Sequence, residues 1–136
     1  MVKKVKDVYT FLILRLTLGL LFVYQGFQKL SAMISGNEGH VQFFDGLGIP
    51  APEVAVWLVG IVELVGGLFL IVGFLTWWTS AALGLIMIAA TLLTGFFGGN
   101  IPTILEHLIY IGAFVALMLA KDVSFALDKQ FGWKQL

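Results

Sequence analysis

The sequence contains four apolar segments, each long enough to cross a lipid bilayer as a helix. They cover residues 9–30, 54–75, 79–97 and 103–120. About 20 helical residues span the roughly 30 Å hydrocarbon core of a bilayer. The composition agrees, because a chain that is 60% hydrophobic and 12% charged is too apolar to stay soluble as a globule. We therefore predict an all-α fold, an integral membrane four-helix transmembrane bundle.

The basic residues predict the orientation of this bundle. Three lysines precede the first span and three follow the last, namely Lys3, Lys4, Lys6, Lys121, Lys129 and Lys134. Loops rich in lysine stay on the cytoplasmic side, so the N and C termini and the tail 121–136 are predicted to be cytoplasmic. We expect one domain, residues 1–136, in the cell (plasma) membrane as a multi-pass protein.

The loop 31–53 is predicted to lie outside, since it carries three carboxylates and no lysine or arginine. Its second half, residues 41–50, mixes aromatic and turn residues and is expected to lie in the membrane interface. It could cover the outer mouth of the bundle as a lid or serve as an interfacial anchor. His40, a lone loop histidine, is expected to be idle.

Composition and missing motifs exclude several classes of function. A formal net charge of zero argues against nucleic acid as a partner. The sequence has no cysteine, so any redox chemistry has to be borrowed from another molecule. Glu106 and His107 are adjacent and point about 100° apart on a helix, which does not suit a metal site, and no metal is expected. No nucleophile elbow or phosphate-binding loop is present.

Glu63 is the strongest functional clue, because it lies in the middle of the apolar segment 54–75. A charge at this depth costs from roughly 3 to well over 10 kcal/mol. It is therefore tolerated only where it faces a partner or a polar cavity. Gly60 and Gly67 flank it on the same helical face. Small residues allow close helix packing, so we predict that Glu63 points into the bundle.

The first span carries a matching stripe. Arg15, Gly19, Phe22, Gly26 and Lys29 fall on one face at 3.6 residues per turn. This stripe is also predicted to face the interior, although its glycines equally permit a homodimer contact.

Two polar clusters are expected inside the bundle. Arg15 is roughly 9 Å and Glu63 roughly 17 Å from the inner ends of their helices, so an Arg15–Glu63 ion pair is geometrically allowed. Near the outer end, Lys29 is level with Glu106 and His107, and Gln25 can be reached from the interior. The pattern from Thr103 to Glu106 predicts a capping box, with Thr103 as N-cap and Glu106 in a structural role.

Two interpretations of these polar residues remain open. They could hold helices together, at about 0.6–2 kcal/mol per contact. Alternatively they form a site in which Glu63 binds a small ligand or exchanges a proton with it and Arg15 sets the charge state of Glu63. In that site the ligand-binding residues are Gln25, Lys29, Glu106 and His107.

The residues also resemble the DoxX family along nearly the whole chain. The likeness rests on the Arg15-to-Phe22 segment with Gly26 and Lys29, on Phe43-Phe44 with Leu47-Gly48-Ile49-Pro50, on Val62-Glu63-Leu64-Val65-Gly66-Gly67, and on Met87. Family members commonly carry histidine at the position of Gln25 and a basic residue at that of Trp77. Their C-terminal signature is reduced here to Ser124, Leu127 and Asp128.

The resemblance implies a small four-span membrane protein related to the DoxX-type subunit of a thiosulfate:quinone oxidoreductase. It implies a quinone-interacting oxidoreductase component, with a membrane quinone as ligand and electrons from a soluble redox partner. Glu63 would exchange protons and Arg15 would be its electrostatic partner. The alternative is a non-enzymatic carrier of a small hydrophobic molecule or a membrane-protein assembly factor. A homo-oligomer is compatible with either.

Overall fold

The structure, a computed structural model, describes residues 2–98, 100–120 and 126–130, and these residues form helices without a strand. The elements in chain order are α1 (Val2–Ile34), α2 (Gly39–Gly46), α3 (Pro52–Val72), α4 (Thr76–Leu93), the π-helical turn η1 (Thr94–Gly98), α5 (Ile101–Leu119) and α6 (Leu127–Gln130). Four of these helices, α1, α3, α4 and α5, are long and apolar enough to cross a membrane. The predicted all-α, four-span architecture is confirmed.

Local sequence signals explain where the helices begin. Pro52 occupies the first turn of α3 with Glu53 beside it, because proline there loses no hydrogen bond and a carboxylate favours the positive helix end. The predicted capping box of the last span is wrong. Its N-cap is Asn100, whose side chain accepts a hydrogen bond from the Thr103 amide, and α5 begins at Ile101. Pro102 lies inside the first turn, where proline is tolerated.

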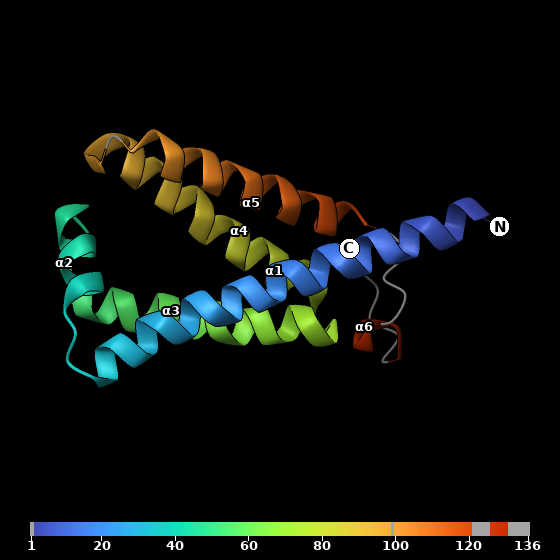
Figure 1. Cartoon of the computed structure of the whole chain (residues 1–136), viewed down its shortest axis with the longest axis horizontal. Helices are drawn as coiled ribbons and strands as arrows, with labels where there is room; N and C mark the ends of the chain where they lie inside the picture. The colour runs from blue at the N-terminus through green and yellow to red at the C-terminus, as the bar shows by residue number, and fades with distance from the viewer. Residues whose placement is uncertain (1, 99, 121–125, 131–136) are drawn as a thin grey trace.

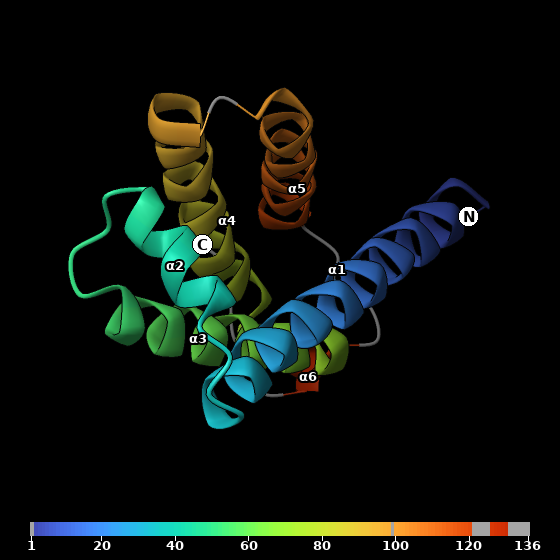
Figure 2. The same cartoon turned by 60° about the vertical axis from the view of Figure 1, so that its left-hand side comes forward.

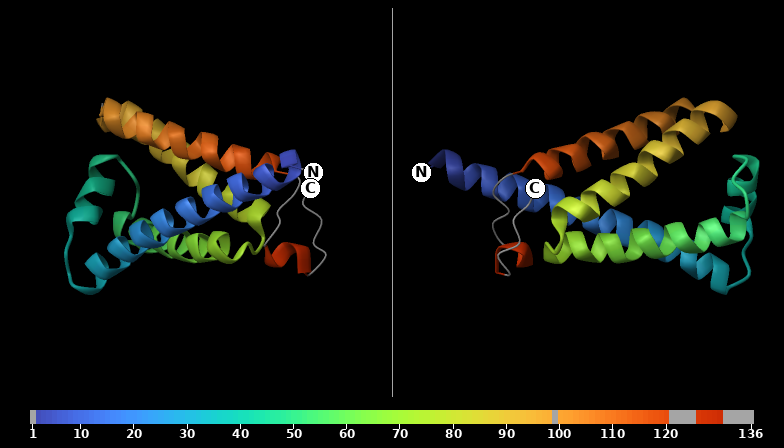
Figure 3. Two further views of the ribbon diagram at one scale, coloured as in Figure 1. Left: turned by 45° about the vertical axis from the view of Figure 1, so that its right-hand side comes forward. Right: turned by 180° about the vertical axis from the view of Figure 1, so that it is seen from behind.

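The long helices are arranged as two pairs. α1 lies alongside α3, and α4 lies alongside α5 (Figure 1). The chain reverses between α3 and α4 through Gly73 and Leu75, both with positive φ. From this turn the two pairs diverge, so α3 and α4 do not pack along their full length (Figure 3). The short helix α2 lies at the open end, between the pairs (Figure 2).

Glycines bring α1 and α3 into close contact. A Cβ atom built on Gly19 would lie 2.8 Å from the carbonyl oxygen of Gly67, and one on Gly26 would lie 2.7 Å from that of Gly60. Neither distance leaves room for a methyl group. The glycine stripes therefore face each other within one chain, as predicted, and these four positions are not available for a homodimer contact.

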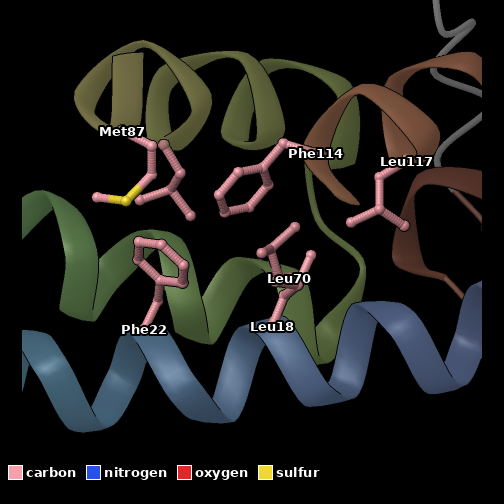
Figure 4. Packing of buried hydrophobic residues seen from close by; sticks show 7 residues of the cluster. Leu18, Phe22, Leu70, Met87, Phe114 and Leu117 are labelled. Atoms are coloured by element: carbon pink, nitrogen blue, oxygen red, sulfur yellow. The ribbon is translucent and has the colours of Figure 1, made fainter. Parts of the chain in front are cut away.

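The apolar core lies where the two pairs converge. It contains the buried residues Leu18, Phe22, Leu70, Leu83, Met87, Phe114 and Leu117 (Figure 4). The Phe22 ring lies edge-to-face against the rings of Phe114 and Tyr110, with centroids 5.1 and 5.8 Å apart. Such aromatic pairs add about 0.5–1.5 kcal/mol beyond their buried area. This core separates the polar groups at the open end from those at the end that holds the α3–α4 turn.

Candidate functional site

The carboxylate of Glu63 forms an ion pair with Lys29. The Lys29 Nζ donates a hydrogen bond to Glu63 Oε2 at 2.6 Å. The Glu63 side chain is 2% exposed and that of Lys29 is 13% exposed. Charged hydrogen bonds of this length are among the strong ones, and each partner offsets the desolvation of the other. Lys29 is thus fixed in the bundle by Glu63, while part of its side chain stays accessible.

The contact between α1 and α3 sets the geometry of this ion pair. Gly26, one turn before Lys29, lies against the backbone of Leu64, the residue after Glu63. A Cβ built on Gly60 would lie 3.2 Å from the Cβ of Lys29. Close backbone contact on both sides holds the stem of Lys29 near Glu63, so its ammonium group reaches the carboxylate.

A pocket of about 490 Å³ lies beside the ion pair, and Lys29 is part of its wall. The other described lining residues come from α1, α2 and α5; they are Leu21, Tyr24, Gln25, Gln28, His40, Phe43, Phe44, Glu106 and Tyr110. The lining combines four aromatic rings with amides and charged groups. A volume in this range suits a small organic ligand, and a mainly apolar wall with a few placed polar groups is typical of ligand sites.

Polar residues of α5 complete the pocket. The Tyr110 hydroxyl donates a hydrogen bond to Glu106 Oε1 at 2.5 Å. On α1, the Gln28 amide donates to the Tyr24 hydroxyl at 2.6 Å. His107 follows Glu106 in α5 but is not among the lining residues of the pocket. Its Nδ1 is buried without a hydrogen-bond partner among the described residues. The predicted outer cluster of Lys29, Glu106 and His107 is thus gathered at one end of the bundle.

The helix α2 covers the end of this pocket. His40, Phe43 and Phe44 of α2 all line it, and Leu47, just after α2, is buried and approaches Gly98 of η1. Of the two interpretations of this loop, the geometry favours a cover over an interfacial anchor. His40 is therefore not remote from the site. Burial, together with the positive charge of Lys29, lowers the pKa of His40, so its ring is neutral at neutral pH.

Arg15 does not meet Glu63, so the predicted ion pair between them is wrong. Arg15 is 1% exposed and packs against Gly73, ten residues further along α3 than Glu63. Ten helical residues correspond to about 15 Å. One nearby charge that attracts Arg15 is the carboxylate of Asp128 in α6. Arg15 lies at the opposite end of the bundle. The cation that pairs with Glu63 is Lys29 and not Arg15.

Asp128 is a structural residue that the sequence reasoning did not select. Its two carboxylate oxygens accept hydrogen bonds from the amides of Leu75 and Thr76, at 2.6 and 2.8 Å, and its own amide donates to the Gly73 carbonyl at 3.0 Å. It therefore caps α4 from a distant part of the chain, which matters because the local N-cap position holds Leu75. The reduced C-terminal signature of Ser124, Leu127 and Asp128 was the feature of the sequence that could have pointed to this role. Ser124 lies outside the described residues.

Asp128→Ala is expected to lower the free energy of unfolding by about 1–2 kcal/mol, the range for loss of an N-cap side chain. The reason is that two amides at the start of α4 lose their acceptor, and Arg15 loses a nearby opposite charge. The measurement is the unfolding midpoint in detergent. Asp45→Ala is the matched control, since Asp45 is exposed on α2. Equal midpoints for the two variants would contradict the capping role.

The fold and pocket define a multi-pass membrane protein with a charged, aromatic-lined pocket at one end of its helix bundle. Among the described residues, no group of three His, Cys, Asp or Glu side chains is placed to hold a metal ion. The chain belongs to the DoxX family, whose profile matches residues 10–96 under the description DoxX. Comparison with curated proteins and with solved structures gave no significant match. The matched region includes Lys29 and Glu63 but ends before α5.

Proposed function

We propose that this protein is a quinone-interacting component of a membrane oxidoreductase, and that the pocket beside Lys29 binds the quinone ring. The observation that carries this proposal is the Lys29–Glu63 ion pair, which holds an ammonium group in the wall of an aromatic-lined pocket inside the bundle. No other described feature combines charge, space and aromatic rings in this way.

We further propose that the membrane is the plasma membrane.

The pocket chemistry matches a quinone ring. Phe43, Phe44 and Tyr110 offer flat surfaces for an aromatic ring, and aromatic pairs favour stacked or edge-to-face contacts. A quinone presents two carbonyl oxygens, which accept hydrogen bonds. The ammonium of Lys29 has three N–H donors, of which Glu63 uses one, so donors remain for a ligand oxygen.

The same groups suit the proton chemistry of quinone reduction. Reduction to the quinol adds two electrons and two protons, and negative charge develops on the oxygens as the electrons arrive. A fixed ammonium group stabilises such charge, and the Lys29–Glu63 pair can pass a proton toward the oxygen. The electrons have to come from a redox partner protein, since the sequence contains no cysteine. Gln25 and Glu106 would contact the bound ring or its oxygens, with His107 adjacent.

Quinone binding in nanodiscs tests the proposal. We expect the wild-type protein to bind one quinone per chain saturably, and the double variant Lys29→Met/Glu63→Leu to bind it at least about tenfold more weakly. The factor follows from loss of a hydrogen bond to a charged group, about 1.5–3 kcal/mol. The double variant removes both charges together, so it leaves no buried charge unpaired. Bound quinone is quantified by extraction and mass spectrometry over a range of quinone concentrations.

Leu85→Met is the matched control, because Leu85 lies exposed on α4, away from the pocket lining. It should bind quinone like the wild type. Absence of saturable binding to the wild type, or equal binding to the double variant, would refute the assigned site. Saturable binding without any change of quinone redox state in native membranes, where partner proteins are present, would favour the carrier function instead.

A further inference from the structure

His40 lies where the pocket meets the surface of the membrane. It belongs to α2, which connects the ends of the spanning helices α1 and α3 and, with 8 residues, is too short to be a span itself (Figure 2). Glu38 and Asp45, just before and within α2, are exposed, as expected beside water. The His40 side chain is half-buried and shares the pocket wall with Lys29. His40 is therefore placed between the ligand site and the water at this end of the bundle.

The apolar core blocks proton movement toward the opposite end of the bundle. Phe22 and Phe114, which pack edge-to-face, are 0% and 1% exposed. Their rings carry no group that takes up or releases a proton. The carboxylate of Glu63 is nearly fully buried against Lys29, so this ion pair is reached from the pocket and not from water directly. A proton that reaches the ligand from water therefore has to pass the pocket wall at a titratable side chain.

Five titratable side chains line the described part of the pocket, and four of them already have partners. Lys29 donates to Glu63, Tyr24 accepts from Gln28, and Tyr110 donates to Glu106. The ring of His40 makes no hydrogen bond to another described residue. Its two nitrogens can therefore bind water and a ligand oxygen.

Histidine suits this position because imidazole exchanges protons near neutral pH. Burial and the positive charge of Lys29 lower the pKa of His40, so the ring does not retain a second proton at neutral pH. The carboxylates nearest along the chain, Glu38, Asp45 and Glu53, are exposed, and water and salt screen their charges. A neutral imidazole has one N–H group and one unprotonated nitrogen. It can take a proton from water on one nitrogen while the other gives a proton up.

We propose that His40 transfers protons between the water at the α2 end of the bundle and the ligand bound beside Lys29. This role rests on the proposed function and specifies where its protons enter. In quinone reduction, two electrons from the redox partner protein and two protons from water convert both carbonyl groups to hydroxyl groups. For each proton passed, an N–H bond of His40 breaks and an O–H bond forms at the reduced oxygen. The other ring nitrogen binds a proton from water, which restores a neutral ring.

Quinone reduction in native membranes tests this role. Membranes that contain equal amounts of the wild-type chain, His40→Ala or Gln42→Ala are compared at neutral pH with membranes that lack the chain, using decylubiquinone as the probe. General acid–base catalysis contributes about 10²–10⁴-fold, so His40→Ala should reduce the quinone at least about tenfold more slowly than the wild type. Quinone binding by His40→Ala in nanodiscs should stay close to that of the wild type. Gln42, exposed on α2 and outside the pocket lining, is the matched control and should behave like the wild type.

Added imidazole separates proton transfer from a structural role of His40. In His40→Ala the truncated side chain leaves space on the water side of the pocket, where imidazole from solution can carry the proton. The rate of His40→Ala should therefore rise toward that of the wild type as the imidazole concentration increases. The rates of the wild type and Gln42→Ala should not change. A purely structural loss in His40→Ala would not respond to imidazole.

Three results would overturn the role of His40. A wild-type rate in His40→Ala, or a slow rate that imidazole does not restore, would refute it while the proposed function stands. A wild-type rate in His40→Ala together with slow reduction in Glu106→Gln would assign proton transfer to Glu106, which also lines the pocket and is exposed. If membranes with the wild-type chain reduce the quinone no faster than membranes without it, the proposed function fails, and the role of His40 fails with it.

Discussion

Single substitutions of the buried ion pair are expected to destabilise the protein far more than the double substitution. Lys29→Met and Glu63→Leu should each lower the free energy of unfolding by about 3 kcal/mol or more, because each leaves one buried charge without its partner. In Lys29→Met/Glu63→Leu both charges are absent and the apolar side chains have similar volume. Most of the lost stability should return, so the double variant should lose less than either single variant and the coupling energy should exceed about 3 kcal/mol.

The measurement is a double-mutant cycle on reversible unfolding in detergent, followed by far-UV circular dichroism. The same cycle on Gln28 and Tyr24 is the control. These two side chains share a hydrogen bond at 2.6 Å but are exposed, so their coupling should stay below about 1 kcal/mol. If the double variant at positions 29 and 63 were as unstable as the sum of its single variants, the two charges would not compensate each other in the bundle.

The number and type of helices followed directly from the sequence, because lipid imposes a simple length requirement. The four spans matched predicted positions to within a few residues, apart from longer ends on the first helix. α1 begins at Val2 and reaches Ile34, whereas the apolar pattern indicated residues 9–30. Polar residues at the ends carry no hydropathy signal, so the extent of α1 could not be judged from apolar residues alone.

That uncertainty explains why the wrong cation was assigned to Glu63. The depth of Arg15 and Glu63 depends on where their helices end, and the apolar pattern gives these ends only to within several residues. The real register is set by backbone contact, with Gly26 against Gly60 and Leu64, and Gly19 against Gly67. In this register Arg15 is level with Gly73 and Lys29 lies near Glu63. The glycine spacing predicted which faces meet, but not how far one helix is shifted along the other.

The pocket was predictable only in part. Gln25, Lys29 and Glu106 were identified because polar residues in apolar segments are rare. His40, Phe43 and Phe44 reach the same pocket from a loop whose path depends on how the two helix pairs diverge. Local sequence contains no information on that angle.

Gly26→Val is expected to disrupt the α1–α3 contact and, with it, the site. A Cβ at position 26 would lie 2.7 Å from the carbonyl oxygen of Gly60 and 2.8 Å from the Cα of Leu64. These are backbone atoms, so no side-chain rotation relieves the overlap, and the helices have to move apart. We expect a loss of at least about 3 kcal/mol in the free energy of unfolding, at the upper end of overpacking effects. The shift in unfolding midpoint measures it.

Gly112→Ala separates this steric effect from helix propensity. Gly112 lies in α5 with no described atom near its Cβ position, so alanine there should leave stability unchanged or raise it by up to about 1 kcal/mol.

The smaller change Gly26→Ala tests whether the helix contact sets the geometry of the site. The Cβ of alanine meets the same backbone atoms of Gly60 and Leu64, so the helices have to shift apart and the 2.6 Å contact between Lys29 and Glu63 lengthens. Quinone affinity should therefore fall in Gly26→Ala while the helix content is retained. Wild-type stability and affinity in this variant would mean that the backbone contact does not set the position of the ion pair.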